Sequence, residues 1–291
     1  MNKTAIVTDS NSAITQAQGK EMGIFVVPMP FLINGEQYYE DINLTQEQFY
    51  EKLKSDADVS TSQPIVGELL SFWDKILEEY DDMVYIPMSS GLSESCSTAK
   101  MLSKDYNGRI HVVDNQRISI TQKQSVFDAK AMLKAGMSAE EIKNFLESTR
   151  LDASIYISLP TLKYLKKGGR ITPAAAAMGS LLHLRPVLQI QGERLDKYRM
   201  NTVTMKSAKA AMIEGLKNDL STRFSALAES GELAVAVAHT ENFEKAEEFS
   251  KELQSIFPDV PFVACDPLSL SVACHIGPGA LACAFTRKWK D

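Results

Sequence analysis

The stretch MVYIPMSSGLSESCS, residues 83–97, decides how the first half of this chain folds. Residues 83–88 form an apolar run of the length of a buried strand, and residues 92–102 are typical of a helix. The polar turn Ser89-Ser90-Gly91 separates them. Because the first backbone N–H groups of a helix lack partners within it, this arrangement predicts an anion site at the turn.

The serines around this turn have two interpretations. In the first, Gly91 lets a ligand approach the backbone closely, while Ser90 and Ser93 offer their hydroxyl groups as donors. In the second, the serines only cap the helix that follows them. Both interpretations stay open from this stretch alone.

The order of strand, polar loop and helix is repeated through the first half of the chain. We expect strands at 4–7, 24–33, 37–40 and 110–113, and helices at 13–22, 41–54, 64–80, 118–135 and 139–148. Asn34-Gly35 predicts a hairpin, and Thr45 with Gln48 predicts a capping box. The alternation predicts an α/β fold with an open, mostly parallel sheet and helices on both faces.

Three loops of this half carry hydroxyl side chains at the start of a helix. They are residues 8–12, 60–64 and 89–93. Ligands of open α/β sheets bind beyond the carboxyl ends of the strands, so we expect these loops to converge on an anionic ligand.

The second half of the chain also alternates between strands and helices. Strands are expected at 153–158, 187–191, 194–198, 233–238 and 260–264, and helices at 173–182, 203–228, 243–256 and in a short apolar segment after residue 280. The whole pattern predicts two α/β domains. The first, residues 1–158, carries the hydroxyl-bearing loops, and the second, residues 159–291, contains a mixed sheet.

Composition narrows the class of protein. The chain has 291 residues, 44% hydrophobic and 23% charged, which is typical of a globular protein. A net charge of -6 argues against non-specific nucleic-acid binding. No apolar run reaches the length of a membrane-spanning helix and no signal peptide is recognised, so we expect a cytoplasmic protein. Four cysteines without a CxxC pair read as reduced thiols, and four scattered histidines predict no metal site.

Signatures of nucleotide binding and of hydrolysis are incomplete. There is no Walker loop, and residues 277–282 fit GxGxxA but leave no room for the βαβ unit that a dinucleotide needs. The serine at 93 lacks the spacing of a nucleophile elbow. Asp9 and Asp114 follow strands, where caps and sheet-end hydrogen bonds are the expected roles of a carboxylate.

Two further features each have two interpretations. The basic stretch around Gly168-Gly169, with Lys163, Lys166, Lys167 and Arg170, is either a solvated loop or a docking surface for an anionic ligand or an acidic partner. His275, which precedes a Gly-Pro-Gly turn, is either a core histidine or a ligand contact.

Five stretches together resemble the DegV family of bacterial fatty-acid-binding proteins. They are IVTDS at 6–10, STSQP at 60–64, SSGLS at 89–93, LKYLKKGGRI at 162–171 and HIGPGA at 275–280. They occur in the family's order over essentially the whole chain. Asn115, Gln122, Gln124 and Arg185 depart from the family's pattern in local loops.

The resemblance implies two α/β domains with a long-chain fatty acid buried between them, the second domain contributing the acyl-chain tunnel. It implies that Thr61 and Ser93 hydrogen-bond the carboxylate and that His275 belongs to the same network. We count Ser62, Ser90, Gly91 and Gly277 in this ligand site. Apolar residues of 174–188 are candidate tunnel walls or ordinary core.

The resemblance also implies a carrier that is not itself an enzyme and that needs no cofactor other than its lipid ligand. In some family members a separate fatty-acid kinase phosphorylates the bound carboxylate, and the product passes to phospholipid synthesis. Lys166, Lys167 and Arg170 are then candidates for a surface that faces the kinase.

Two other functions remain open from the sequence. One is an enzyme acting on small acyl or phosphoryl substrates, with Ser93 as nucleophile and His275 as base. The other is a protein-interaction module that holds a lipid as a structural plug and binds its partner through Lys166, Lys167 and Arg170.

Overall fold

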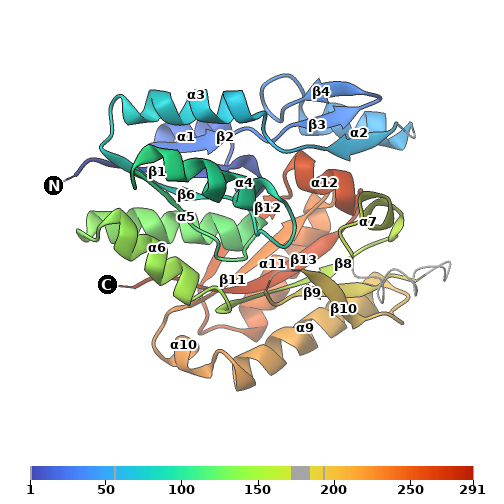
Figure 1. The fold of residues 1–291 in the computed structure, drawn as a ribbon. Coiled ribbons are helices and arrows are strands. Elements are labelled where there is room, and N and C mark those ends of the chain that lie inside the picture. Colours follow the sequence, from blue (N-terminus) through green and yellow to red (C-terminus); the bar gives the residue numbers. More distant parts are fainter. Residues whose placement is uncertain (1, 56, 172–183, 193, 291) are drawn as a thin grey trace. The chain divides into compact units, whose positions relative to one another are not determined.

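The computed structural model describes residues 2–55, 57–171, 184–192 and 194–290 (Figure 1). Contacts divide the chain into two units. The N-terminal unit takes the chain up to Arg150 together with Ser269–Ser271, and the C-terminal unit takes Leu151–Leu268 and Val272–Lys290. The helix expected at 173–182 lies outside the described residues.

A parallel sheet forms the centre of the N-terminal unit. Its four strands, in spatial order, are β2 (Ile24–Val27), β1 (Thr4–Asp9), β6 (Asp82–Ile86) and β7 (Ile110–Val112). All six residues of β1 are buried, as expected for a strand covered on both faces. The predicted parallel sheet is therefore confirmed.

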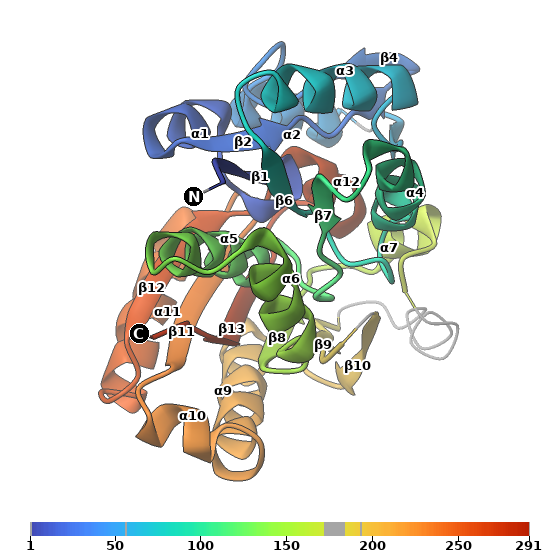
Figure 2. The same cartoon turned by 60° about the vertical axis from the view of Figure 1, so that its left-hand side comes forward.

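Helices cover both faces of this sheet (Figure 2). The helices of the parallel part are α1 (Gln16–Met22), α3 (Val66–Leu77), α4 (Ser95–Leu102), α5 (Ser119–Lys134) and α6 (Ala139–Ser148). On one face, Trp73 of α3 and Cys96 of α4 pack with Val7 and Tyr85 of the strands. On the other face, α5 contacts β1 and β6. Successive side chains of one strand point to opposite faces of the sheet and pack in two separate apolar layers.

A small antiparallel sheet interrupts the parallel part. It consists of β4 (Glu36–Tyr38), β3 (Phe31–Ile33) and β5 (Val59–Thr61), with α2 (Gln46–Lys54) between β4 and β5 in the chain. The Asn34-Gly35 hairpin is confirmed, with positive φ at both residues. The single strand expected at 24–33 is wrong. Pro28 and Pro30 lack the N–H that a ladder needs, so the chain breaks there into β2 and β3.

The C-terminal unit contains a mixed sheet of six strands. In spatial order they are β10 (Leu195–Arg199), β9 (Val187–Ile190), β8 (Ala153–Ser158), β13 (Leu281–Arg287), β11 (Leu233–His239) and β12 (Phe262–Pro267). Only the pair β11 and β12 is parallel among these neighbours. The helices are α7 (Lys163–Gly168), α9 (Met205–Thr222), α10 (Ser225–Glu229), α11 (Phe243–Ile256) and α12 (Leu270–Ile276).

Two features of this unit differ from the expectation. The apolar segment after residue 280 is strand β13 and not a helix, because it pairs with β8 on one side and β11 on the other. The division of the chain falls after Arg150 and not after residue 158, since β8 belongs to this sheet.

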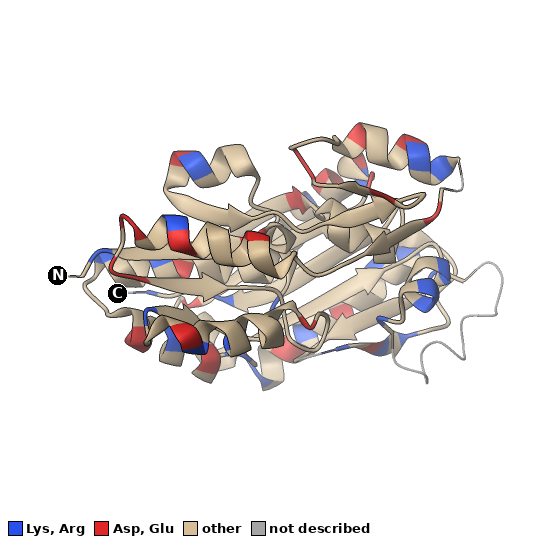
Figure 3. Ribbon diagram, turned by 45° about the horizontal axis from the view of Figure 1, so that its top comes forward, with Lys and Arg blue, Asp and Glu red and all other residues tan. Residues whose placement is uncertain are grey.

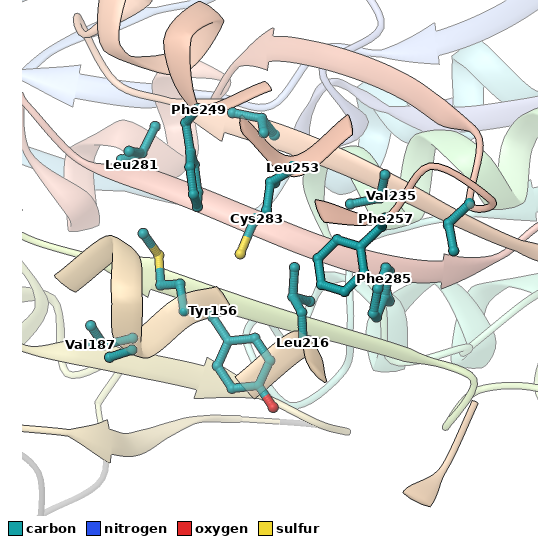
Figure 4. Close-up of a cluster of buried hydrophobic side chains, with 14 of the residues drawn as sticks. Tyr156, Val187, Leu216, Val235, Phe249, Leu253, Phe257, Leu281, Cys283 and Phe285 are labelled. Carbon is teal, nitrogen blue, oxygen red and sulfur yellow. The ribbon is translucent and has the colours of Figure 1, made fainter. Parts of the chain in front are cut away.

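An apolar cluster holds α9 and α11 to the sheet (Figure 4). Phe285 lies with its ring 5.1 Å from that of Phe257 and 6.3 Å from that of Phe224. The ring of Tyr156 lies against Gly215 of α9, where an added Cβ would come within 2.6 Å of it. Among the helices that the structure describes, none is long and apolar enough to cross a bilayer.

Candidate functional site

The backbone N–H groups of residues 90–93 already donate to acceptors within the protein. Ser90 N donates to Asp114 Oδ1 at 3.3 Å, and Gly91 N donates to Ser89 Oγ at 3.2 Å. The next two N–H groups, of Leu92 and Ser93, both donate to Ser89 O at 3.1 Å. Helix α4 starts at Ser95, so the helix start expected at residue 92 is wrong. The N–H groups of residues 90–93 are therefore engaged by Asp114 and Ser89, whereas the hydroxyl of Ser93 can still donate to a ligand.

Ser93 forms a pair with Ser95, a residue that the sequence analysis did not select. Ser95 N donates to Ser93 Oγ at 3.2 Å, and Ser93 Oγ donates to Ser95 Oγ at 3.0 Å. A hydroxyl hydrogen rotates freely, so the direction of the second bond reverses when a ligand accepts from Ser93. Ser93 is half-buried, whereas Ser95 is buried. The pair thus leaves one hydroxyl able to donate to a carboxylate.

Asp9 fixes the segment that leads into this turn. Its Oδ2 accepts from Met88 N at 2.8 Å, and its Oδ1 accepts from Asn11 N and from Gln122 Nε2, both at 3.0 Å. Burial raises the pKa of Asp9, although these hydrogen bonds act in the opposite direction. Asp9 is a sheet-end hydrogen bonder, as the sequence predicted, and it orders the loops after β1 and β6 together.

The second predicted loop begins where β5 ends. Thr61 pairs with Phe31 of β3 and is half-buried, and Ser62 is exposed. Gln63 Oε1 accepts from Thr98 Oγ1 of α4 at 2.8 Å. This hydrogen bond ties the loop of Thr61 and Ser62 to the helix that follows the turn at 89–93. The five predicted ligand residues of the N-terminal unit therefore lie in two segments, one after β5 and one before α4, and the first segment is hydrogen-bonded to α4. Thr98 was missed because nothing local in the sequence marks it.

His275 and Gly277 lie in the C-terminal unit, at the end of α12. The adjoining surface is α7, since a Cβ on Gly168 would come within 2.0 Å of His275 Nδ1. Gly277 has φ of +76°, and a Cβ there would come within 2.3 Å of the Tyr164 ring. Glycine at both positions is what allows the two helices to approach. Thr240 holds the turn by donating from Oγ1 to Gly277 O at 2.6 Å.

The positive charge of Arg170 acts on the imidazole of His275. Burial is the main cause that lowers the pKa of His275 to about 4, and the positive charge of Arg170 lowers it further. Arg170 Nη1 donates back to Gly168 O, the residue against which His275 packs. Lys166 and Lys167 are exposed on α7, whose basic residues are blue in Figure 3. The sequence analysis had placed Arg170 on a partner surface and His275 in the ligand site.

We expect His275 to remain uncharged at neutral pH and Arg170→Gln to raise its pKa. The folded pKa of about 4 lies below the ordinary 6.5, so the neutral imidazole stabilises the fold fully above pH 6.5. That contribution is lost as the pH falls towards 4. NMR titration of the imidazole Cε1–H measures both values, with the signal assigned by its absence in His275→Gln. Lys166→Gln is the control and leaves the pKa in place; an unchanged pKa in Arg170→Gln would contradict the assignment.

No group of three or more His, Cys, Asp or Glu side chains arranged to hold a metal ion occurs among the described residues. The predicted ligand residues in both units offer uncharged hydrogen-bonding groups. Thr61, Ser90 and Ser93 offer hydroxyls, and His275 offers an uncharged ring.

The chain is an α/β protein of two units, and the N-terminal unit carries the hydroxyl-bearing loops. The chain belongs to the DegV family, described as a family of uncharacterised proteins, whose sequence profile matches residues 3–288. A DegV domain-containing protein of Staphylococcus aureus is 26% identical over 288 residues, which cover 99% of this chain and 100% of that protein.

Two solved structures are similar over almost the whole length. A DegV family protein of Thermus thermophilus, described as fatty acid binding, has a TM-score of 0.86 and 27% identity, covering 98% of this chain and 99% of its own. DegV of Bacillus subtilis, described as a fatty acid binding protein, has a TM-score of 0.85 and 28% identity, covering 99% and 100%. The α/β architecture with a parallel and a mixed sheet is therefore that of the family.

Proposed function

We propose that this protein is a carrier for a long-chain fatty acid whose carboxylate is hydrogen-bonded by Thr61 and Ser93. The observation that carries the proposal is the likeness, over 98% of the chain, to a protein described as fatty acid binding. The hydroxyl geometry supports it, because the segment after Thr61 is hydrogen-bonded, through Gln63 and Thr98, to the helix that follows Ser93.

Neutral donors suit a carboxylate that is to be released or modified. Each hydrogen bond to a charged group contributes about 1.5–3 kcal/mol, so two hydroxyls hold the head group without a fixed positive charge. Ser90 and Gly91 shape the turn beside Ser93, and Ser62 follows Thr61. We assign His275 and Gly277 to the same ligand, with the neutral imidazole as a further hydrogen-bonding group.

The acyl tail supplies most of the affinity in this proposal. About fifteen methylene groups gain roughly 12 kcal/mol at about 0.8 kcal/mol each when they leave water. The loss of translational freedom and the ordering of the tail offset much of this gain. The tail therefore sets how tightly the acid binds, and the two hydroxyls set which way it points.

We propose further that the bound acid is presented to a separate fatty-acid kinase for phospholipid synthesis. The carboxylate is held by neutral groups, so one of its oxygens keeps the electron density needed to attack a phosphoryl group. Lys166 and Lys167 are exposed and offer a positive surface to an acidic partner. None of the four cysteines, all of which the structure describes, forms a disulfide; this fits a reducing compartment, and we place the carrier in the cytoplasm.

The contacts of Ser93 and His275 favour a carrier over the acyl-transfer enzyme considered above. Ser93 Oγ donates to Ser95 Oγ, a hydroxyl that does not accept a proton near neutral pH. A histidine with a pKa of about 4 is a weak general base at pH 7, where an effective base has a pKa close to the working pH.

Mass spectrometry of the protein purified from a bacterial host tests the proposal. Under native conditions we expect a mass excess of one long-chain fatty acid, which disappears on denaturation because the acid is not covalently bound. Addition of a fatty-acid kinase with ATP then adds one phosphoryl group to the ligand. An unliganded protein that also takes up no added oleate or palmitate would refute lipid binding, and a liganded protein without phosphorylation would refute only the presentation.

A further inference from the structure

The three residues Ser269–Ser271 are assigned to a different unit from the chain around them. Ser269–Ser271 belong to the N-terminal unit, although the chain before and after them belongs to the C-terminal unit. Leu270 is the first residue of helix α12, and His275 lies in the last turn of the same seven-residue helix. A group that is hydrogen-bonded to Leu270 therefore also holds the first turn of the helix that carries His275.

The group that is hydrogen-bonded to Leu270 is the carboxylate of Glu40. Its Oε2 accepts from Leu270 N at 2.8 Å, and its Oε1 accepts from Gln46 Nε2 of α2 at 2.7 Å. The N–H of a first helical residue has no partner within the helix, so Glu40 caps α12 from a distant part of the chain. A second attachment lies beside it, where Ser271 Oγ donates to Asn11 Oδ1 at 2.7 Å.

The backbone around Glu40 holds this side chain in place. Asp41 N donates to Leu44 O at 3.1 Å, and Tyr39 N donates to Asn43 Oδ1 at 2.7 Å. Asp41 adopts a positive φ of 60°, which closes the loop tightly. The carboxylate of Glu40 is thus aimed at α12 by a compact turn and is not free to move with a flexible loop.

The charge of Glu40 is poorly compensated. Burial raises its pKa to about 7, although the hydrogen bonds from Leu270 and Gln46 act to lower it. Asp41 raises it further by repulsion and is the charged group that acts on Glu40 among the described residues. The groups that bond to the carboxylate are both uncharged, the side-chain amide of Gln46 on α2 and the backbone N–H of Leu270. No ion pair to Glu40 occurs in the described part of the chain.

We propose that Glu40 is a latch on the first turn of α12, closed while its carboxyl group is protonated and opened more often once it ionises. An ionised carboxylate gains hydration when the turn opens, whereas a protonated one loses only hydrogen bonds. Opening is therefore favoured as the pH rises from the ordinary value of 4.5 to about 7, and it becomes independent of pH above that. The test of the latch needs no lipid, so its outcome does not depend on the proposed lipid site.

Amide hydrogen exchange of residues 269–276 measures the opening. After correction for the intrinsic exchange rate, protection in the unchanged protein is expected to fall about twentyfold between pH 5.5 and 7.5, as linkage to one carboxyl group requires. Glu40→Gln removes the charge and keeps an acceptor for Leu270 N, so its protection is expected to be flat over this range. Glu47→Gln, which changes an exposed carboxylate of α2, is the matched control and keeps the full dependence.

A role limited to capping gives a different result. In that case Glu40→Gln lowers the protection of residues 269–276 by the same factor at every pH. If the dependence of protection on pH is as steep in that variant as in the unchanged protein, the latch is overturned. Asp41→Asn provides a second test that does not depend on the folding of Glu40→Gln. It removes the repulsion and is expected to move the upper limit of the transition to lower pH, while a fixed limit contradicts the proposal.

Discussion

A protein with Thr61→Val and Ser93→Ala together is expected to bind its fatty acid about two to four orders of magnitude more weakly. Thr61→Val replaces the hydroxyl with a methyl group of similar volume, and Ser93→Ala removes the hydroxyl alone. Two hydrogen bonds to a charged carboxylate, at about 1.5–3 kcal/mol each, give a loss of this size. Titration calorimetry with a delipidated protein, and the occupancy of the purified protein, measure the effect.

The fold is expected to survive these changes. Thr61 lies at the end of β5 and Ser93 in a turn before α4, so neither side chain fills the apolar core. Ser97→Ala is the control, because Ser97 is an exposed serine on α4. Full occupancy of the double variant, equal to that of the control, would show that the carboxylate lies elsewhere.

Phe285→Ala is expected to lower the free energy of unfolding of the C-terminal unit by about 4 kcal/mol, as for other large core aromatics. Phe285 is fully buried on the central strand β13, and its ring packs on those of Phe257 and Phe224. Its removal leaves a cavity that the strand cannot fill, because β13 is held by β8 on one side and β11 on the other.

Phe243→Ala is the matched control in the same unit, since the side chain of Phe243 is 57% exposed. Urea unfolding followed by circular dichroism compares the two variants through the midpoint and the slope of the transition. We expect the control to stay within about 1 kcal/mol of the unchanged protein, as exposed positions usually do. A loss of the same size at both positions would contradict the packing described for Phe285.

Local signals in the sequence were sufficient for much of the fold. Short apolar runs that end in polar loops predicted the parallel sheet, because strands buried on both faces need continuous apolar sequence. Asn34-Gly35 predicted its hairpin, and Thr45 with Gln48 predicted a capping box that the structure contains. Each of these features depends on residues a few positions apart, so the sequence carries the whole of the interaction.

The same local reasoning was misleading where a distant partner decides the outcome. The apolar residues after 280 fit a helix as well as a strand, and pairing with β8 and β11 makes them a strand. At the turn at 89–93 the sequence did not show that Asp114 and Ser89 accept from the N–H groups of residues 90–93, and the carboxylate site at the Ser93 hydroxyl stays a proposal.

The sequence by itself determined the hydroxyl-bearing loops, the α/β class and the family resemblance. Only the tertiary structure decided which of these groups act together. It tied the loop of Thr61 to α4 through Gln63, placed the charge of Arg170 beside His275, and brought Glu40 to the first residue of α12, 230 positions away. The physical reason is that burial and long-range hydrogen bonds set the donors and the pKa values of a site, and neither is written in any short stretch of chain.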